Sequence, residues 1–180
     1  MSLSDLVDFP TRSMRTTRLV SCLLLVGLLG ITAHPAAAQI SIPPQSFEEV
    51  VATAQEEQTP ILVEIYASWC PYCQRMQNTV YSHSTVQEYL DDNFTYVRLN
   101  SDTTGGNHTY ANRTLTTSQL ASVLGARGVP TTVFMKPDGT PIARQPGFIK
   151  RPTFLTMIRF VGSGAYEDQS YKEFARQQSK

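Results

Sequence analysis

The sequence predicts an α/β fold in which a mixed central sheet is covered by helices on both faces. Helix-like and strand-like segments alternate along most of the chain, which is typical of parallel strands joined through helices. Residues 61–67 form a short apolar run, as expected of a buried strand. The Pro-Asp-Gly-Thr stretch at residues 137–140 separates two strand-like runs and predicts an antiparallel hairpin.

A helix is predicted to begin at Phe47 and to end before Pro60. Ser46 and Glu49 have the pattern of a capping box, in which each side chain bonds the backbone N–H of the other residue. The apolar side chains of this helix share one face: Phe47, Val50, Val51 and Ala54. The buried strand at residues 61–67 follows directly.

Two more helices follow this strand. The segment from the second cysteine to about residue 81 is predicted as a helix because Met76 and Val80 lie on one face. The next segment is predicted to run from Ser84 to residue 93, with Ser84 and Gln87 as its cap.

Residues 94–99 alternate in hydrophobicity and predict a second strand, and a polar stretch follows at residues 101–116. This stretch contains Gly105 and Gly106 and has little apolar periodicity. A structureless loop of such length inside a compact domain is usually functional or disordered. We therefore expect a long irregular loop here.

The predicted elements after this loop are a helix, the hairpin and a final helix. The first covers residues 117–124, stops at Gly125, and turns three side chains inward: Leu120, Val123 and Leu124. The hairpin pairs residues 132–135 with residues 142–143. Pro152 opens the final helix, whose inward side chains are Phe154, Leu155, Ile158 and Val161.

Residues 1–38 are predicted to be a signal peptide that directs export to the periplasm. An apolar run at residues 19–32 follows three arginines, and the alanines at residues 36–38 provide a cleavage site. The apolar run is shorter than the ~20 residues that span a bilayer. Met14 is a second candidate for the true start of the chain. The alternative is an uncleaved segment that anchors the protein in the membrane.

The remaining chain is expected to contain an extended lead-in at residues 39–45, one domain at residues 46–164 and a polar C-terminal tail at residues 165–180 with a short helix. Removing residues 1–38, which include three arginines and two aspartates, leaves twelve basic and thirteen acidic residues. Neither a basic stripe nor a charge block is present, so no nucleic-acid partner is expected.

Cleavage of the signal peptide would remove Cys22 and leave Cys70 and Cys73. Two residues between cysteines allow a small disulfide ring that can close and reopen. Cys70 is predicted at a helix N-terminus, where free N–H groups and the helix dipole favour a thiolate, the nucleophile of disulfide exchange. Zinc and c-type haem are not expected, because His83 and His108 lack ligand spacing and Gln74 follows the second cysteine.

Residues 46–164 resemble the thioredoxin superfamily on three features. The run Trp69-Cys70-Pro71-Tyr72-Cys73 comes directly after the first buried strand. The run Gly128-Val129-Pro130-Thr131 stands where the family has its cis-proline loop. Glu64, six residues before Cys70, occupies the position of the family's buried acid. The resemblance implies a thioredoxin fold.

Within this superfamily, the chain is similar to exported thioredoxin-like reductases. These include the periplasmic thioredoxins of sulfur-oxidation operons and the C-terminal domain of the transmembrane electron-transfer reductase. Gly147 and Phe148 after the hairpin, and the run at residues 160–166, favour the first group.

The resemblance implies a thiol–disulfide oxidoreductase that reduces disulfides in proteins. Cys70, which is expected to be exposed, attacks the target disulfide, and Cys73 resolves the mixed disulfide. A purely stabilising disulfide is disfavoured, because closing so short a ring removes little chain entropy. Apart from this redox-active disulfide, neither cofactor nor metal is expected. The alternatives are an oxidase or isomerase with the same site, and a non-catalytic binding or chaperone module.

The other site residues are assigned mainly through the resemblance. Glu64 accepts the proton of Cys73, unless it is an outward-facing strand residue. Val129 pairs with the substrate backbone as an added strand. Pro130 forms the cis bond, the alternative being an ordinary trans loop proline. Trp69, Pro71 and Tyr72 contribute partner contacts beside the cysteines, the alternative for Trp69 being a core aromatic.

Electron flow is expected to run toward reduction of the partner. Pro71 and Tyr72 place no positive charge between the cysteines. We expect a potential between about −270 mV, as in thioredoxin, and about −120 mV, as in the strongest bacterial oxidant, nearer the reducing end. Such a reductase needs a membrane protein as electron donor. A monomer is expected.

Overall fold

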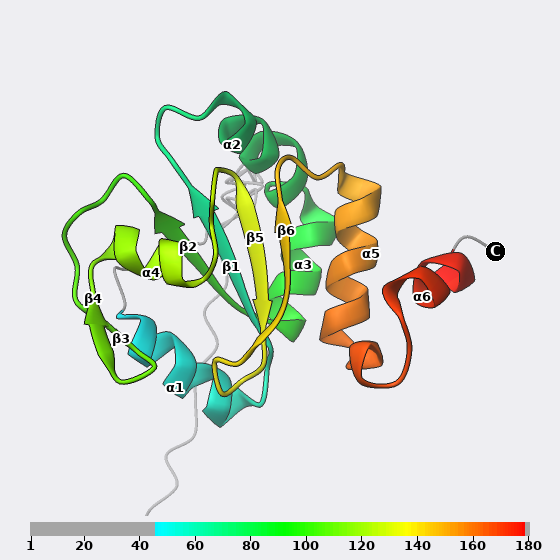
Figure 1. Cartoon of the computed structure of the whole chain (residues 1–180). Helices are drawn as coiled ribbons and strands as arrows, with labels where there is room; N and C mark the ends of the chain where they lie inside the picture. The colour runs from blue at the N-terminus through cyan, green and yellow to red at the C-terminus, as the bar shows by residue number, and fades with distance from the viewer. Residues whose placement is uncertain (1–45, 179–180) are drawn as a thin grey trace, which may run out of the picture. The chain divides into compact units, whose positions relative to one another are not determined.

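The computed structural model describes residues 46–178 of the chain (Figure 1). The predicted signal peptide at residues 1–38, the lead-in at residues 39–45 and Cys22 lie outside the described residues.

A mixed four-stranded sheet forms the centre of the domain, as the sequence predicts. The strand order is β2-β1-β5-β6, and the strands are β1 Ile61–Tyr66, β2 Thr95–Asn100, β5 Thr131–Met135 and β6 Pro141–Pro146. β1 pairs in parallel with β2 and antiparallel with β5, and β5 pairs antiparallel with β6. The central strand β1 is therefore buried on both faces.

Helices cover both faces of this sheet (Figure 1). One face carries α1 (Phe47–Glu57) and α4 (Thr117–Val123), which pack on Ile61, Val63 and Ile65 of β1. On the other face, Leu62 of β1 contributes to a second core cluster. Four helical segments cover this face: α2 (Pro71–Met76), the π-helical turn η1 (Gln77–Tyr81), α3 (Ser84–Asn93) and α5 (Arg151–Gly162).

Of the two helix caps that the sequence predicts, one is confirmed and the other is wrong. At α1, the Ser46 N–H donates to Glu49 Oε2 over 2.8 Å and the Glu49 N–H donates to Ser46 Oγ over 3.3 Å, which confirms the capping box. At α3, His83 is the N-cap and Ser84 is already the first helical residue. The predicted cap of Ser84 with Gln87 is wrong.

The inward face predicted for α4 is partly wrong. Leu120 and Leu124 are buried, but Val123 is exposed and Ala121 packs inward instead. α4 begins with a capping box formed by Thr116 and Gln119.

Residues 101–116 contain a small hairpin, so the expectation of an irregular loop is wrong. β3 (His108–Tyr110) pairs antiparallel with β4 (Arg113–Leu115). The two turn residues, Ala111 and Asn112, have φ values of 51° and 59°, and positive φ at both central positions is what a two-residue hairpin turn of type I′ requires. Three-residue strands are too short to show periodicity, and Ala-Asn lacks the usual glycine of such a turn.

His108 fixes this hairpin to the rest of the domain. Its Nδ1 accepts from the Phe47 N–H at the start of α1 over 3.2 Å, so Nε2 carries the proton and donates to Thr117 Oγ1 over 2.9 Å. The Thr117 hydroxyl in turn donates to the Gly105 carbonyl over 3.0 Å. The neutral imidazole therefore joins α1, β3 and α4.

The last two elements of the described residues are a short 3-10 helix (Ala165–Glu167) and α6 (Tyr171–Gln178). α6 packs on α5, where the Phe160 ring lies 5.6 Å from that of Tyr171 and 5.4 Å from that of Phe174, between centroids. Within residues 46–178, no helix has the length and apolar character needed to cross a bilayer.

Acidification is expected to weaken the hairpin attachment through His108. Burial places the pKa of His108 below its ordinary value. The stability that the neutral ring provides is complete above the unfolded pKa of about 6.5 and is lost as pH falls through the folded pKa. Urea unfolding of wild type and His108→Asn on both sides of that pH measures the effect, because asparagine keeps an acceptor for the Phe47 N–H but does not titrate. An equal loss of stability in both proteins would contradict this role.

Candidate functional site

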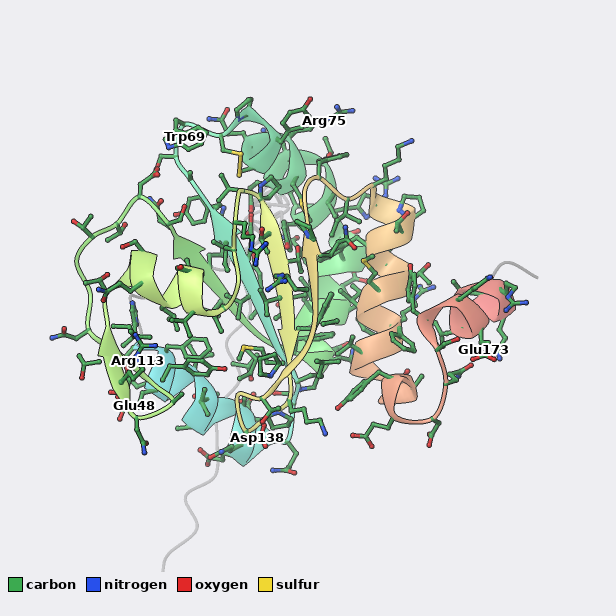
Figure 2. The ribbon with its side chains drawn as sticks, viewed as in Figure 1. Glu48, Trp69, Arg75, Arg113, Asp138 and Glu173 are labelled. Carbon is green, nitrogen blue, oxygen red and sulfur yellow. A yellow bond between two sulfur atoms is a disulfide. The ribbon has the colours of Figure 1, made fainter. Side chains whose placement is uncertain are left out.

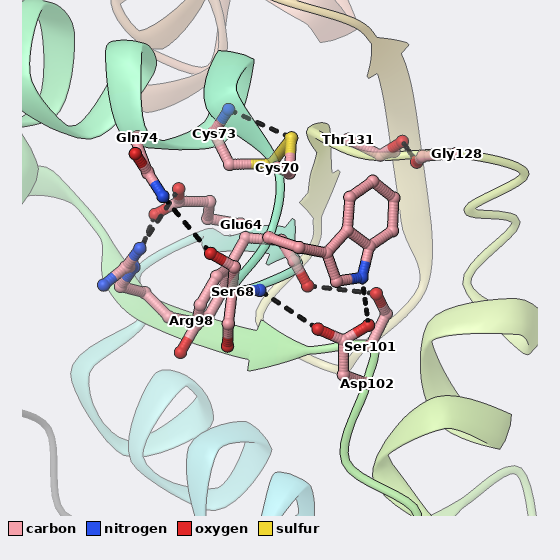
Figure 3. The surroundings of a disulfide bond; sticks show 12 residues. Glu64, Ser68, Cys70, Cys73, Gln74, Arg98, Ser101, Asp102, Gly128 and Thr131 are labelled. Carbon is pink, nitrogen blue, oxygen red and sulfur yellow. Dashed lines mark hydrogen bonds and ion pairs between the residues drawn. A yellow bond between two sulfur atoms is a disulfide. The ribbon is translucent and has the colours of Figure 1, made fainter.

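The two cysteines form a disulfide at the start of α2, beyond the C-terminal end of β1 (Figure 3). Their Cα atoms lie 5.3 Å apart, within the ordinary range for a disulfide. Cys70 is the N-cap of α2, and its Sγ accepts from the Cys73 N–H over 3.1 Å. Pro71 occupies the first turn, where its fixed φ suits a helix and its missing N–H loses no bond. The prediction that Cys70 lies at a helix N-terminus is confirmed, although the helix begins two residues earlier than predicted.

Both cysteines are nearly covered in this oxidised form. Cys70 keeps 3% of its surface exposed and Cys73 keeps 2%. The expectation of an exposed Cys70 is wrong, because the disulfide packs against Ala67 and Val129. The residues beside Cys70 are open to solvent: Trp69 is 71% exposed and Tyr72 is 59% exposed. Two large aromatic side chains therefore stand at the surface next to a small exposed part of the disulfide.

Asp102 holds Trp69 in this position. The Trp69 Nε1–H donates to Asp102 Oδ1 over 2.9 Å, and the Ser68 N–H donates to Oδ2 over 3.0 Å. The alternative of a core tryptophan is wrong. Asp102 is a site residue that sequence reasoning missed, yet it follows β2, whose C-terminal end must lie beside that of its parallel neighbour β1. Strand topology could have identified it.

The loop before β5 forms the opposite side of the site. The Val129–Pro130 peptide bond is cis. Val129 packs against the cluster of Ala67, Cys70 and Cys73, and no hydrogen bond in the described part of the chain engages its backbone N–H or carbonyl. The Thr131 hydroxyl donates to the Gly128 carbonyl over 2.7 Å and fixes the bend of this loop beside Cys70 (Figure 3).

Glu64 is completely buried in the middle of β1, so the alternative of an outward-facing glutamate is wrong. Its Oε2 accepts from the Tyr96 hydroxyl over 2.5 Å and from Arg98 Nε over 2.7 Å. Arg98 lies directly opposite Glu64 in the parallel register of β1 and β2. The guanidinium also lies 4.3 Å from the centre of the Tyr66 ring, an arrangement typical of a cation–π contact.

The groups around Glu64 hold their protons firmly. Burial, followed by the charge of Glu64, raises the pKa of Tyr96 well above 10, and the same two causes act on Tyr81. Burial is the largest single effect on Arg98 and would lower its pKa, but the charge of Glu64, the hydrogen bond to Glu64 and the nearby Tyr96 and Tyr66 together outweigh it, so the pKa is raised. A charged guanidinium and a neutral phenol therefore donate to the carboxylate.

A cavity of about 300 Å³ lies between the disulfide and this ion pair. Its walls include Cys73, Arg98 and Gln77, whose Oε1 is buried without a hydrogen-bond partner. Glu64 itself does not line the cavity, and Arg98 is the residue that contacts both the cavity and the carboxylate. Within residues 46–178, no group of His, Cys, Asp and Glu is arranged to hold a metal ion.

The sheet order, the helix-start disulfide and the loop before β5 define a protein of the thioredoxin-fold class. A family model confirms the class: residues 47–162 match the thioredoxin-like domain, and the chain belongs to this family.

Curated relatives share part of the sequence. The thiol:disulfide interchange protein DsbD of Yersinia enterocolitica is 29% identical over 154 residues, which are 76% of this chain and 25% of that protein. DsbD of Cronobacter sakazakii is 32% identical over 109 residues, which are 59% of this chain and 17% of that protein. The chain thus spans a quarter or less of the length of these relatives. Likeness to the thioredoxins of sulfur-oxidation operons stays a prediction.

Solved structures agree with the fold. A thioredoxin-fold protein from Helicobacter pylori superposes with a TM-score of 0.58 at 20% identity, covering 67% of this chain and 80% of that one. A thioredoxin from Thermus thermophilus superposes with a TM-score of 0.51 at 28% identity, covering 64% of this chain and 83% of that one.

Asp102→Ala is expected to release the Trp69 ring with little change in stability. The two hydrogen bonds that the Asp102 carboxylate accepts, from Trp69 and Ser68, are both exposed, so losing them should lower the free energy of unfolding by only about 1–2 kcal/mol. Trp69 is the only tryptophan of the chain, so the anisotropy of tryptophan fluorescence reports directly on it and should fall. Asp92→Ala, an exposed aspartate of α3, is the matched control. Unchanged anisotropy in Asp102→Ala would show that another contact holds the ring.

Arg98→Met is expected to destabilise the domain more than the double variant Glu64→Gln/Arg98→Met. Removing one partner of a buried ion pair typically costs about 3–5 kcal/mol, and the loss should be smaller here because 32% of the Arg98 side chain is exposed. The double variant leaves no buried charge and keeps an acceptor for the Tyr96 hydroxyl. Urea unfolding of the two variants tests this, and a double variant less stable than Arg98→Met would refute it.

Proposed function

We propose that this protein is an exported thiol–disulfide oxidoreductase that reduces disulfides in other proteins. The observation that carries the proposal is the Cys70–Cys73 disulfide at the start of α2, with the Cys73 N–H donating to Cys70 Sγ. Membership of the thioredoxin-like family and similarity to the thiol:disulfide interchange protein DsbD support the same chemistry.

Cys70 is the attacking sulfur in this proposal. After reduction, the helix dipole and the Cys73 N–H both stabilise a negative charge on Cys70 Sγ. The thiolate attacks one sulfur of the partner disulfide, forming a mixed disulfide and releasing the other partner sulfur as a thiolate that takes up a proton. Cys73 then loses its proton and attacks Cys70 Sγ, which releases the reduced partner and restores the Cys70–Cys73 disulfide. Two electrons pass to the partner, so each cycle needs a reductant.

Glu64 is the proposed acceptor of the Cys73 proton. It is the buried carboxylate of the described residues, and Arg98 connects it to the cavity that Cys73 lines. Water would carry the proton across this cavity to the side of the carboxylate that Arg98 contacts. The cavity gives Cys73 an open space next to Arg98 in a site that is otherwise covered.

The partner is proposed to bind over the exposed residues around Cys70. Trp69 and Tyr72 provide large apolar contacts with few rotatable bonds, and Pro71 lies exposed between them. The free backbone groups of Val129 can pair with an extended segment of the partner as an added strand. The cis bond at Pro130 shapes the loop that presents them.

The proposal includes a periplasmic location, reached through the signal peptide at residues 1–38, and action as a monomer. A membrane protein would supply the electrons, because the compartment itself is oxidising. An uncleaved N-terminal anchor would place the same domain at the membrane surface.

Reduction of insulin by the full chain with dithiothreitol tests the function. Cys70→Ser is expected to lower the rate by on the order of 100-fold or more, because the attacking thiolate is lost. Cys73→Ser is expected to lower turnover and to trap the partner on Cys70 as a mixed disulfide visible by non-reducing electrophoresis. Cys22→Ser, the same change at the third cysteine, is the matched control and keeps the wild-type rate.

Equal rates for wild type and Cys70→Ser would eliminate the catalytic proposal and leave a binding module. Faster oxidation of a reduced dithiol peptide than reduction of its disulfide would eliminate the reducing direction and identify an oxidase.

A further inference from the structure

The charge around the disulfide differs in sign from the charge of the domain. Residues 46–178 contain eleven basic and thirteen acidic residues, so the described part of the chain is slightly acidic. The exposed charged side chains around the two cysteines are nevertheless mostly basic, with Asp102 as the exception. Four exposed residues form what we call the basic rim: Arg75, Arg127, Lys150 and Arg151.

Three members of the basic rim lie on one side of the disulfide. Arg75 follows Cys73 by two residues on α2, and its guanidinium lies 4.8 Å from the centre of the Phe148 ring. This contact brings the connection between β6 and α5 against α2 (Figure 1). Lys150 and Arg151 stand in that connection, at the N-cap and first residue of α5.

Arg127 lies on the other side of the disulfide. It is exposed two residues before Val129, which packs against the cluster of Ala67 and the two cysteines. Trp69 and Tyr72 stand exposed beside Cys70. The basic rim therefore flanks an apolar centre that contains the reactive sulfurs.

Nothing neutralises the basic rim within the described residues. Their one ion pair joins Arg98 to Glu64, away from the rim. The segments that carry the rim, residues 69–75, 126–130 and 147–152, contain no Asp or Glu. Asp102 is the carboxylate at the site, and both of its oxygens already accept from Trp69 and Ser68.

The position of Lys150 and Arg151 is unfavourable for α5 itself. The N-terminus of a helix favours negative charge, yet α5 begins with two cations and has neither a side-chain cap nor an acidic residue in its first turn. α1 instead has Glu48 and Glu49 there. Figure 2 shows Glu48 and Asp138 at the end of the domain away from Trp69 and Arg75.

We propose that the basic rim selects partner proteins whose disulfide is flanked by acidic side chains. The inference rests on the proposed function and specifies its substrate class. Carboxylates of the partner would supply the charges that the rim and the α5 N-terminus lack, while Trp69 and Tyr72 contact the apolar surface at the disulfide. Such complementarity acts chiefly on the association rate and on partner choice, and it weakens with salt.

Three synthetic peptides that share one disulfide ring and differ only in flanking residues, Glu, Ser or Lys, test the selection. The reduced full chain is mixed with each peptide, and the second-order rate constant of reduction is followed by Trp69 fluorescence. At low salt, the Glu peptide is expected to react about tenfold or more faster than the Lys peptide, with the Ser peptide between them. Near 1 M salt, where the Debye length is ~3 Å, the three rates should converge.

The triple variant Arg75→Glu/Lys150→Glu/Arg151→Glu is expected to reverse the order of the Glu and Lys peptides. Its matched control is Arg113→Glu/Lys136→Glu/Lys172→Glu, which changes the net charge equally at exposed positions on other elements. Figure 2 shows Arg113 far from Trp69 and Arg75. The control keeps the wild-type preference if the rim is responsible.

Equal rates for the three peptides in the wild type would overturn the selection while leaving the proposed function intact, and this comparison needs no variant. An equal loss of preference in both triple variants would attribute the effect to net charge and also overturn the basic rim. If the wild type reduces none of the peptides, the proposed function itself fails.

Discussion

The pairing of β1 at the centre of the sheet is the constraint on which the site depends. β1 runs parallel to β2 and antiparallel to β5, so the C-terminal ends of β1 and β2 meet the N-terminal end of β5 at one edge. Cys70 follows β1, Asp102 follows β2 and Pro130 precedes β5. Three segments far apart in the sequence thereby surround one disulfide, and the loops that carry them need no other scaffold.

The ion pair of Glu64 and Arg98 links the core of that sheet to the cavity beside Cys73. A completely buried carboxylate is expensive unless it is paired and hydrogen-bonded, and the parallel register of β1 and β2 supplies Arg98 directly opposite it. Arg98 is only partly buried and also lines the cavity beside Cys73. The same cation therefore compensates the buried charge in the core of the domain and places a positive charge in the cavity beside Cys73.

Acidic and basic side chains lie in different parts of the domain, although their numbers nearly balance. The described chain is close to neutral, yet most of its acidic residues lie on α1, α3, the turn between β5 and β6 and the C-terminal segment. Asp102 is the exposed carboxylate at the site, and the exposed cations near the disulfide have no ion-pair partner. Trp69, held by Asp102, and Tyr72 occupy the centre of this region. An apolar centre within a basic border is a surface on which shape and charge both contribute to the choice of partner.

Local chemistry in the sequence determined most of the elements, the position of Cys70 at a helix start and the burial of β1. Ser46 with Glu49, the turn at residues 137–140 and the spacing of Met76 and Val80 each act within a few residues, so their effect can be read without a fold. The hairpin at residues 101–116 was missed because its strands are too short to be periodic. Only the tertiary structure decided that Cys70 is covered by Val129 and that Glu64 faces Arg98. Those facts depend on which strands become neighbours and in what register, and long-range pairing leaves no mark in the local spacing of residues.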